Sequence, residues 1–231
     1  MNFISNLVKY ILRRLINGLV IFDSKLKRGK IMEQKTYRAG LVKLSFWFSE
    51  FRKVVQFLNE GMTLKDIEQL NIAENIFLAP TQARAIQIYK TVFTRVKSLH
   101  ADFYSIFEKS DITNQKIINL MAIMESDALF FDFMYEVYRE KLLLGVDEIA
   151  DSDISIFFKD KQLQSERVAK WTDYTLKRLG ECYKTMLMEA GVLERETGVR
   201  RIIRPITDRA LEAKLKEHGM AITLHALTGV R

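Results

Sequence analysis

The recurrence of apolar residues every three or four positions is the feature that most constrains how this sequence folds. The pattern persists through most of the 231 residues, and only Pro80 and Pro205 interrupt it with a proline. Apolar residues at this spacing form one face of an α-helix, and proline inside a helix removes a backbone hydrogen bond. We therefore predict an all-α, mainly helical protein with a hydrophobic core.

Capping residues divide the first part of this pattern into three predicted helices. One helix ends at Gly61, and a short helix begins after Thr63, where Asp66 is placed to complete a capping box. Thr81 is expected to begin a longer helix that runs towards Phe107. The order of helix, short helix and longer helix is compatible with a helix-turn-helix and also with a plain helical bundle. The basic residues of the longer helix are expected to point away from the core: Arg84, Lys90, Arg95 and Lys97.

The last third of the chain predicts a second group of elements. A short helix follows Ser165, and a longer helix follows Thr172. Two short strands, residues 192–196 and 199–204, then flank a Thr-Gly turn and predict a C-terminal β-hairpin. A helix, a short helix, a longer helix and a hairpin follow one another in this order in a winged helix-turn-helix, whose second helix of the turn enters the DNA major groove.

The net charge of +7 is unevenly distributed. Residues 1–31 carry +6, so the rest of the chain is nearly neutral. Within it, residues 102–162 carry −7, whereas the four hairpin arginines and Glu196 give a local +3. These arginines would contact phosphate or the minor groove, or else they balance the acidic middle of the same chain. They are Arg195, Arg200, Arg201 and Arg204.

The sequence predicts three parts. Residues 1–31 form a basic amphipathic extension, residues 32–112 an N-terminal helical bundle, and residues 113–231 a winged-helix-like domain. The extension has no apolar run long enough to span a membrane. It remains either a helix on a membrane surface, a helix that docks on the body, or a segment upstream of a working start at Met32.

Catalytic and metal-binding signatures are missing from the sequence. It has no P-loop, no dinucleotide-binding glycine pattern and no nucleophile elbow. The histidines at positions 100, 218 and 225 are scattered, and Asp132, Glu136 and Glu140 at four-residue spacing are expected to form a solvated helix face. The single Cys182 is expected in the core, and it predicts a reduced, cytoplasmic setting. We therefore expect no enzyme activity, metal, cofactor or small-molecule substrate.

Several short segments together resemble the BrxA family of the bacteriophage exclusion (BREX) systems of bacteria and archaea. The match spans residues 37–227, and its segments are residues 37–41, 129–131, 133–141, 151–154 and 189–191, with Trp171, Thr172 and Thr175. The resemblance implies a mainly helical, non-enzymatic protein that binds double-stranded DNA. It also implies other BREX subunits as partners, among them a methyltransferase, a phosphatase-like protein and a large ATPase.

The winged-helix order selects the candidate DNA contacts. On the longer helix they are Thr175, Lys177 and Arg178, and on the hairpin they are the four arginines. Arg84 and Lys90 would form a second contact. Asp173 at the helix start would repel phosphate, which argues against strong sequence recognition there. Two other functions remain open: a protein–protein adaptor within the defence complex, and a membrane-surface protein held by residues 1–31.

Overall fold

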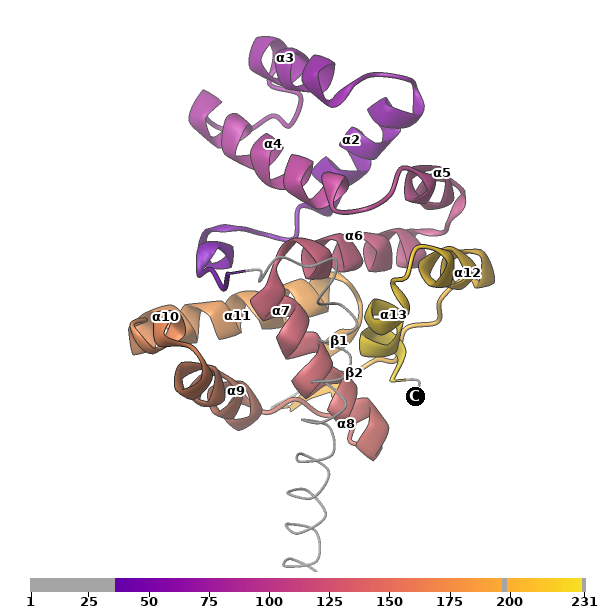
Figure 1. Cartoon of the computed structure of the whole chain (residues 1–231). Helices are drawn as coiled ribbons and strands as arrows, with labels where there is room; N and C mark the ends of the chain where they lie inside the picture. The colour runs from indigo at the N-terminus through magenta and orange to yellow at the C-terminus, as the bar shows by residue number, and fades with distance from the viewer. Residues whose placement is uncertain (1–35, 197–198, 230–231) are drawn as a thin grey trace, which may run out of the picture. The chain divides into compact units, whose positions relative to one another are not determined.

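The computed structural model describes residues 36–196 and 199–229, apart from the side chains of residues 195, 196 and 199. Tyr37–Arg231 forms one compact unit. The predictions for residues 1–31, for the Thr-Gly turn and for the Arg195 side chain lie outside the described part. The prediction of a mainly helical chain with one hairpin is confirmed (Figure 1). The elements are η1 (Gly40–Lys43), α2 (Phe48–Asn59), α3 (Leu64–Glu74), α4 (Gln82–Lys97), α5 (Asp102–Lys109), α6 (Ile112–Ser126), α7 (Ala128–Phe133), η2 (Met134–Tyr138), α8 (Arg139–Leu144), α9 (Asp151–Gln164), α10 (Glu166–Ala169), α11 (Asp173–Glu189), β1 (Leu193–Glu196), β2 (Val199–Ile202), α12 (Arg209–Glu217) and α13 (Ala221–Thr228).

The expected helix starts are confirmed by their capping bonds. The side chain of Thr63 accepts from the backbone of Asp66, and the Asp66 carboxylate accepts from the backbone of Thr63, which completes the capping box of α3. The side chains of Thr81, Ser165 and Thr172 each accept a hydrogen bond from the backbone N–H three residues on, and so cap α4, α10 and α11, respectively. Because each cap satisfies a backbone N–H that the helix leaves unpaired, these residues fix where the helices begin.

The prediction of one helix from Thr81 to Phe107 is wrong, because α4 ends at Lys97 and α5 begins at Asp102. The Ser98 hydroxyl contacts the carbonyl oxygens of Arg95, at 2.7 Å, and Ala122, at 3.1 Å. A serine that bonds to nearby backbone competes with helical hydrogen bonding, and here it also joins the end of α4 to α6.

Helix α6 is central to the fold. It contacts α2, α4 and α5, which precede it in the sequence, and α7 and α11, which follow it. Residues from Ile117 to Met124 are buried without a break, so α6 has core on all of its faces. The expected boundary between residues 112 and 113 falls at the start of this helix. Helix α7, the π-helical turn η2 and α8 then follow as one nearly continuous run.

Aromatic side chains join α7, α9 and α11. Tyr183 of α11 lies against Phe130 and Phe133 of α7, with ring centroids 4.9 Å and 5.2 Å apart, and against Phe158 of α9 at 5.8 Å. Gly180 faces Ile154, where a Cβ atom would lie only 2.8 Å from the isoleucine Cγ2. The absence of a side chain at this position therefore allows α9 and α11 to pack closely.

The hairpin follows α11 directly. Strands β1 and β2 are antiparallel, and Leu193 pairs with Ile202 and Glu196 with Val199. Gly191 has a positive φ of 77° at the end of α11, which suits the turn into β1. Helices α12 and α13 complete the chain, and α12 contacts α5 (Figure 1).

Candidate nucleic-acid interface

The elements from α9 to β2 follow the order that the sequence predicted for a winged helix-turn-helix. Helix α10 is a single turn, and Thr172 at the start of α11 accepts a hydrogen bond from the backbone N–H of Thr175. The Thr175 hydroxyl lies 3.0 Å from the Thr172 hydroxyl, so it is already engaged in the cap. These bonds fix where α11 begins.

Two of the candidate contacts lie on the exposed face of α11. Lys177 and Arg178 are exposed, and Tyr174, which is 73% exposed, precedes them by one turn. Lys184, further along the same helix, is not accessible to a partner. Lys184 is buried and forms ion pairs with Asp151, at 2.9 Å, and Glu181, at 2.7 Å. The accessible positive charge of α11 is therefore concentrated in its first half.

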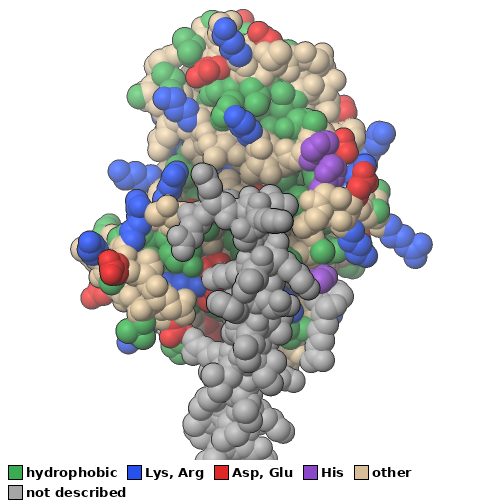
Figure 2. All heavy atoms as spheres, in the orientation of Figure 1, with side chains coloured by type: hydrophobic (Ala, Val, Ile, Leu, Met, Phe, Trp, Pro, Cys, Tyr) green, Lys and Arg blue, Asp and Glu red, His purple; other side chains and the backbone are tan. Residues whose placement is uncertain are grey.

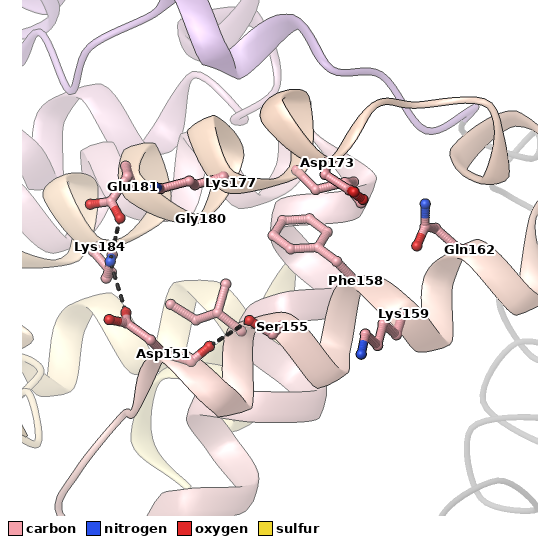
Figure 3. A pocket seen from close by; sticks show the side chains of 12 residues that line it. Asp151, Ser155, Phe158, Lys159, Gln162, Asp173, Lys177, Gly180, Glu181 and Lys184 are labelled. Carbon is pink, nitrogen blue, oxygen red and sulfur yellow. Dashed lines mark hydrogen bonds and ion pairs between the residues drawn. The ribbon is translucent and has the colours of Figure 1, made fainter.

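A groove of about 420 Å³ separates α9 from α11 (Figure 3). Ile154, Phe158 and Leu176 provide its apolar lining. Its charged lining carries both signs: Asp151, Lys159, Asp173, Lys177, Glu181 and Lys184. Since the acidic and basic groups are equal in number, the groove itself has no net attraction for a phosphate. Positive charge offered to a nucleic acid must come from the exposed faces beside it.

The described hairpin arginines contact the end of α8, the loop that follows it and the first residue of α9. Arg200 forms an ion pair with Asp151 at 2.9 Å, and Arg201 with Asp147 at 3.6 Å. The Arg204 guanidinium donates to the Leu142 carbonyl at 3.4 Å. Lys184 and then Arg200 hold the pKa of Asp151 below its usual value. These contacts correspond to the alternative in which the arginines balance the acidic middle of the chain, and DNA would have to compete with them.

The second pair of candidates lies on α4. The Arg84 guanidinium stacks over the Trp47 ring at 5.0 Å and donates to Gln87 at 2.8 Å. Lys90 is exposed. The structure thus leaves Lys90 accessible to a phosphate, whereas Arg84 already has partners within the fold.

Two basic residues that the sequence did not single out extend the α11 surface. Arg167 of α10 and Lys170 just after it are both exposed. Residues 166–178 contain four basic and two acidic side chains, which gives a local net charge of +2. Figure 2 shows Lys and Arg side chains at the left edge of the molecule, at the level of η1 and α10. The signal for these residues in the sequence was their place on, or directly after, the short helix that precedes α11.

A model of the BrxA family matches residues 35–219. The chain belongs to the BrxA family. It is similar to the BREX protein BrxA of Bacillus cereus (strain H3081.97), with 37% identity over 201 residues. These residues make up 86% of this chain and 100% of the relative. It also resembles the crystal structure of an uncharacterized protein from Magnetospirillum magneticum, with a TM-score of 0.69 and 16% identity over 84% of this chain and 99% of that chain. This second likeness shows a shared fold.

A buried lysine, Lys161, lies in a charge cluster that includes Tyr37 and Glu136 of the BrxA-like segments. Lys161 is 1% exposed, and its ammonium group donates to Asp132 at 2.8 Å and Glu136 at 2.7 Å. The Tyr37 hydroxyl also donates to Asp132. The expected solvated face at Asp132 and Glu136 is therefore wrong. Burial by itself lowers the pKa of Lys161, but the two carboxylates outweigh it, and the pKa lies above its usual value.

The cysteine and two of the histidines lie outside the candidate interface. Cys182 is half-buried, and burial raises the pKa of its thiol, which disfavours the reactive thiolate. His100 and His218, far apart in the sequence, stack on each other with ring centroids 4.1 Å apart.

Across the part of the chain that the structure describes, no helix is both long enough and apolar enough to cross a membrane.

Proposed function

We propose that this BrxA-family chain is a non-enzymatic, DNA-binding accessory protein of a BREX phage-resistance system. Family membership and the name of the Bacillus cereus relative support the place in BREX. The exposed basic surface of residues 166–178 supports the binding of double-stranded DNA. In such a system the other BREX subunits are its partners, and it acts by holding DNA rather than by transforming a substrate.

The observation that carries the DNA-binding proposal is the difference between the basic residues of α11 and those of the hairpin. Lys177 and Arg178 are exposed, and neither forms an ion pair with another described residue. Arg200 and Arg201 already have carboxylate partners. A phosphate gains the full attraction of an unpaired cation, but it must replace a partner at a paired one. Helix α11 therefore supplies the main contact, and the hairpin lies alongside it.

Contacts to the phosphate backbone account for most of the proposed affinity. Asp173 in the first turn of α11 suits the helix dipole but repels an approaching phosphate. The Thr175 side chain is engaged in the cap. The helix tip is therefore poorly equipped to read base edges, and we expect similar affinity for duplexes of different sequence.

Duplex binding measured at several salt concentrations tests this assignment. The variant Lys177→Ala/Arg178→Ala should weaken binding and lower the slope of log K against log salt by about 0.9 for each phosphate that the protein no longer neutralises. Arg200→Ala/Arg201→Ala/Arg204→Ala should lower affinity and slope less, because the wild-type arginines are already paired within the protein. Lys65→Ala/Lys109→Ala removes two exposed charges elsewhere and serves as the control.

An unchanged slope in the α11 variant would exclude this helix from the interface. A larger effect of the hairpin variant would instead make the arginines the main contact. Equal effects in all three variants would indicate that only the overall charge matters.

A protein–protein adaptor is the second candidate function, and exposed apolar residues on α9 favour it. Ile156 is 49% and Leu163 is 88% exposed, and their seven-residue spacing places them on one face of the helix. If duplex DNA fails to bind even at low salt while a BREX subunit binds and the variant Ile156→Ser/Leu163→Ser does not, the adaptor function replaces the DNA-binding one.

A further inference from the structure

Two histidines and one aspartate from two distant parts of the chain meet on the surface beside α5 and α12. His100 lies in the turn between α4 and α5, Asp102 begins α5, and His218 follows the last residue of α12. Ligand atoms of all three side chains lie within 4.8 Å of one another. Their side chains are partly accessible to solvent, with 56%, 39% and 20% of their surface exposed, respectively.

The individual distances suit a common ion. His100 Nδ1 lies 3.4 Å from Asp102 Oδ1, and His218 Nε2 lies 3.0 Å from Asp102 Oδ2. Two ligands of one tetrahedral zinc ion, each about 2.0–2.1 Å from it, lie about 3.4 Å apart. Because the ligand atoms here lie up to 4.8 Å apart, the exposed His100 ring must shift by about 1.5 Å and turn out of its stack on His218 for all three to bind one ion.

Two contacts that the cluster already makes would give way to such an ion. Lys214 contacts Asp102 Oδ2 at 3.2 Å, but it also pairs with Glu217 at 2.9 Å and keeps that partner when an ion takes its place. The backbone N–H of Asp102 points at His100 Nδ1 from 3.3 Å, which places the lone pair of this nitrogen on the side of the aspartate. An ion would replace both of these contacts.

We propose that His100, Asp102 and His218 form a binding site for a transition metal ion of the zinc class. Two imidazole nitrogens and one carboxylate oxygen are ligands that Zn²⁺ accepts, with water in the fourth position. Imidazole nitrogen favours zinc over magnesium, which prefers oxygen ligands. Because Asp102 and His218 lie 116 residues apart in the chain, the bound metal fastens the end of α12 to the start of α5.

Titration of the full chain with ZnCl₂, followed by calorimetry, tests the site. One equivalent should bind, ZnCl₂ should raise the melting temperature, and MgCl₂ should do neither. The variants His100→Gln and His218→Gln should each weaken Zn²⁺ binding at least about tenfold. The matched control is His225→Gln, which changes the remaining histidine outside the cluster and should bind Zn²⁺ as the unaltered chain does.

The Zn²⁺ affinity of Lys214→Met distinguishes a metal site from a cluster with a purely structural role. Removal of the competing ammonium group should make Zn²⁺ bind more tightly, because Asp102 Oδ2 then has no positively charged lysine beside it. Circular dichroism establishes that each variant is folded. The proposal is overturned if the folded wild-type chain binds no Zn²⁺, if His100→Gln and His218→Gln retain its affinity, or if His225→Gln weakens binding as much as they do.

Discussion

Arg95 is a charged side chain in the middle of the core. It is 2% exposed, and its guanidinium donates to the backbone carbonyls of Phe46 at 2.6 Å and Ser45 at 2.8 Å. Burial lowers its pKa to about 10, so it remains positively charged at neutral pH. Arg95 thereby holds the segment before α2 against α4, since this segment has no regular structure to satisfy its own carbonyl groups.

Replacement of Arg95 by Met should destabilise the protein by about 1.5–3 kcal/mol, because two hydrogen bonds from a charged donor are lost. The Phe46 carbonyl keeps its bond from Asn119, at 3.0 Å, and the exposed Ser45 can turn to water, so the cost is that of the lost bonds and not of a buried unpaired group. Urea unfolding followed by circular dichroism measures the change. Arg52→Met, at an exposed position of α2, is the control, and equal stability of the two variants would contradict this role of Arg95.

Arg95, Lys161 and Lys184 show what sequence periodicity misses at the scale of single residues. Helical spacing places Arg95 and Lys184 on a solvated face and gives Lys161 no role, yet each is buried and paired. A polar residue is assigned to solvent by default because burial of a lone charge is costly. Apart from Glu181, three residues before Lys184, the charged and carbonyl partners of these side chains come from segments 25–50 residues away, so local spacing carries no sign of them.

At the scale of elements, the sequence predicted helix starts well because caps are local. Thr63, Thr81, Ser165 and Thr172 each cap the helix that follows. The end of α4 was missed, because Ser98 also bonds to the Ala122 carbonyl of α6. For the candidate interface, the sequence selected Lys177 and Arg178, but the pairing of Arg200 with Asp151 depends on how the hairpin lies against α9.

The close packing of α9 on α11 depends on Gly180. In Gly180→Ala, the new Cβ atom meets Ile154 Cγ2 at 2.8 Å, so the helices must separate or the isoleucine must move. Overpacking of this kind costs about 1–3 kcal/mol, which exceeds the gain of about 1 kcal/mol from the higher helix propensity of alanine. Thermal unfolding should therefore show a lower melting temperature.

Gly40→Ala is the matched control, since no atom lies within 4 Å of a Cβ built there. In an Ile154→Ala background the Cγ2 atom is absent, and Gly180→Ala should become neutral or stabilising. If Gly180→Ala lowers the melting temperature equally in both backgrounds, the contact with Ile154 is not the cause.

At the scale of the whole molecule, the net charge indicates a nucleic-acid surface only when its distribution along the chain is considered. Most of the +7 lies in residues 1–31, whereas the body is nearly neutral. Within the body, Asp147 and Asp151 pair with arginines of the hairpin, and a basic surface remains on α10 and α11. The sequence revealed the separation of charge along the chain. It could not reveal which charges neutralise one another, because that depends on tertiary contacts.

A chain that begins at Met32 should keep the stability and the duplex affinity of the full chain. The described helices and every proposed contact belong to Tyr37–Arg231, which forms a compact unit, and 86% of this chain spans the whole of the Bacillus cereus relative. Melting temperature and salt-dependent DNA binding of the two chains measure this, and flotation with anionic liposomes tests the membrane alternative.

If residues 1–31 contact phosphate, the slope of log K against log salt falls on truncation by about 0.9 for each phosphate that they neutralise. If they hold the protein on a membrane, only the full chain floats, because the nearly neutral body has little attraction for anionic lipid.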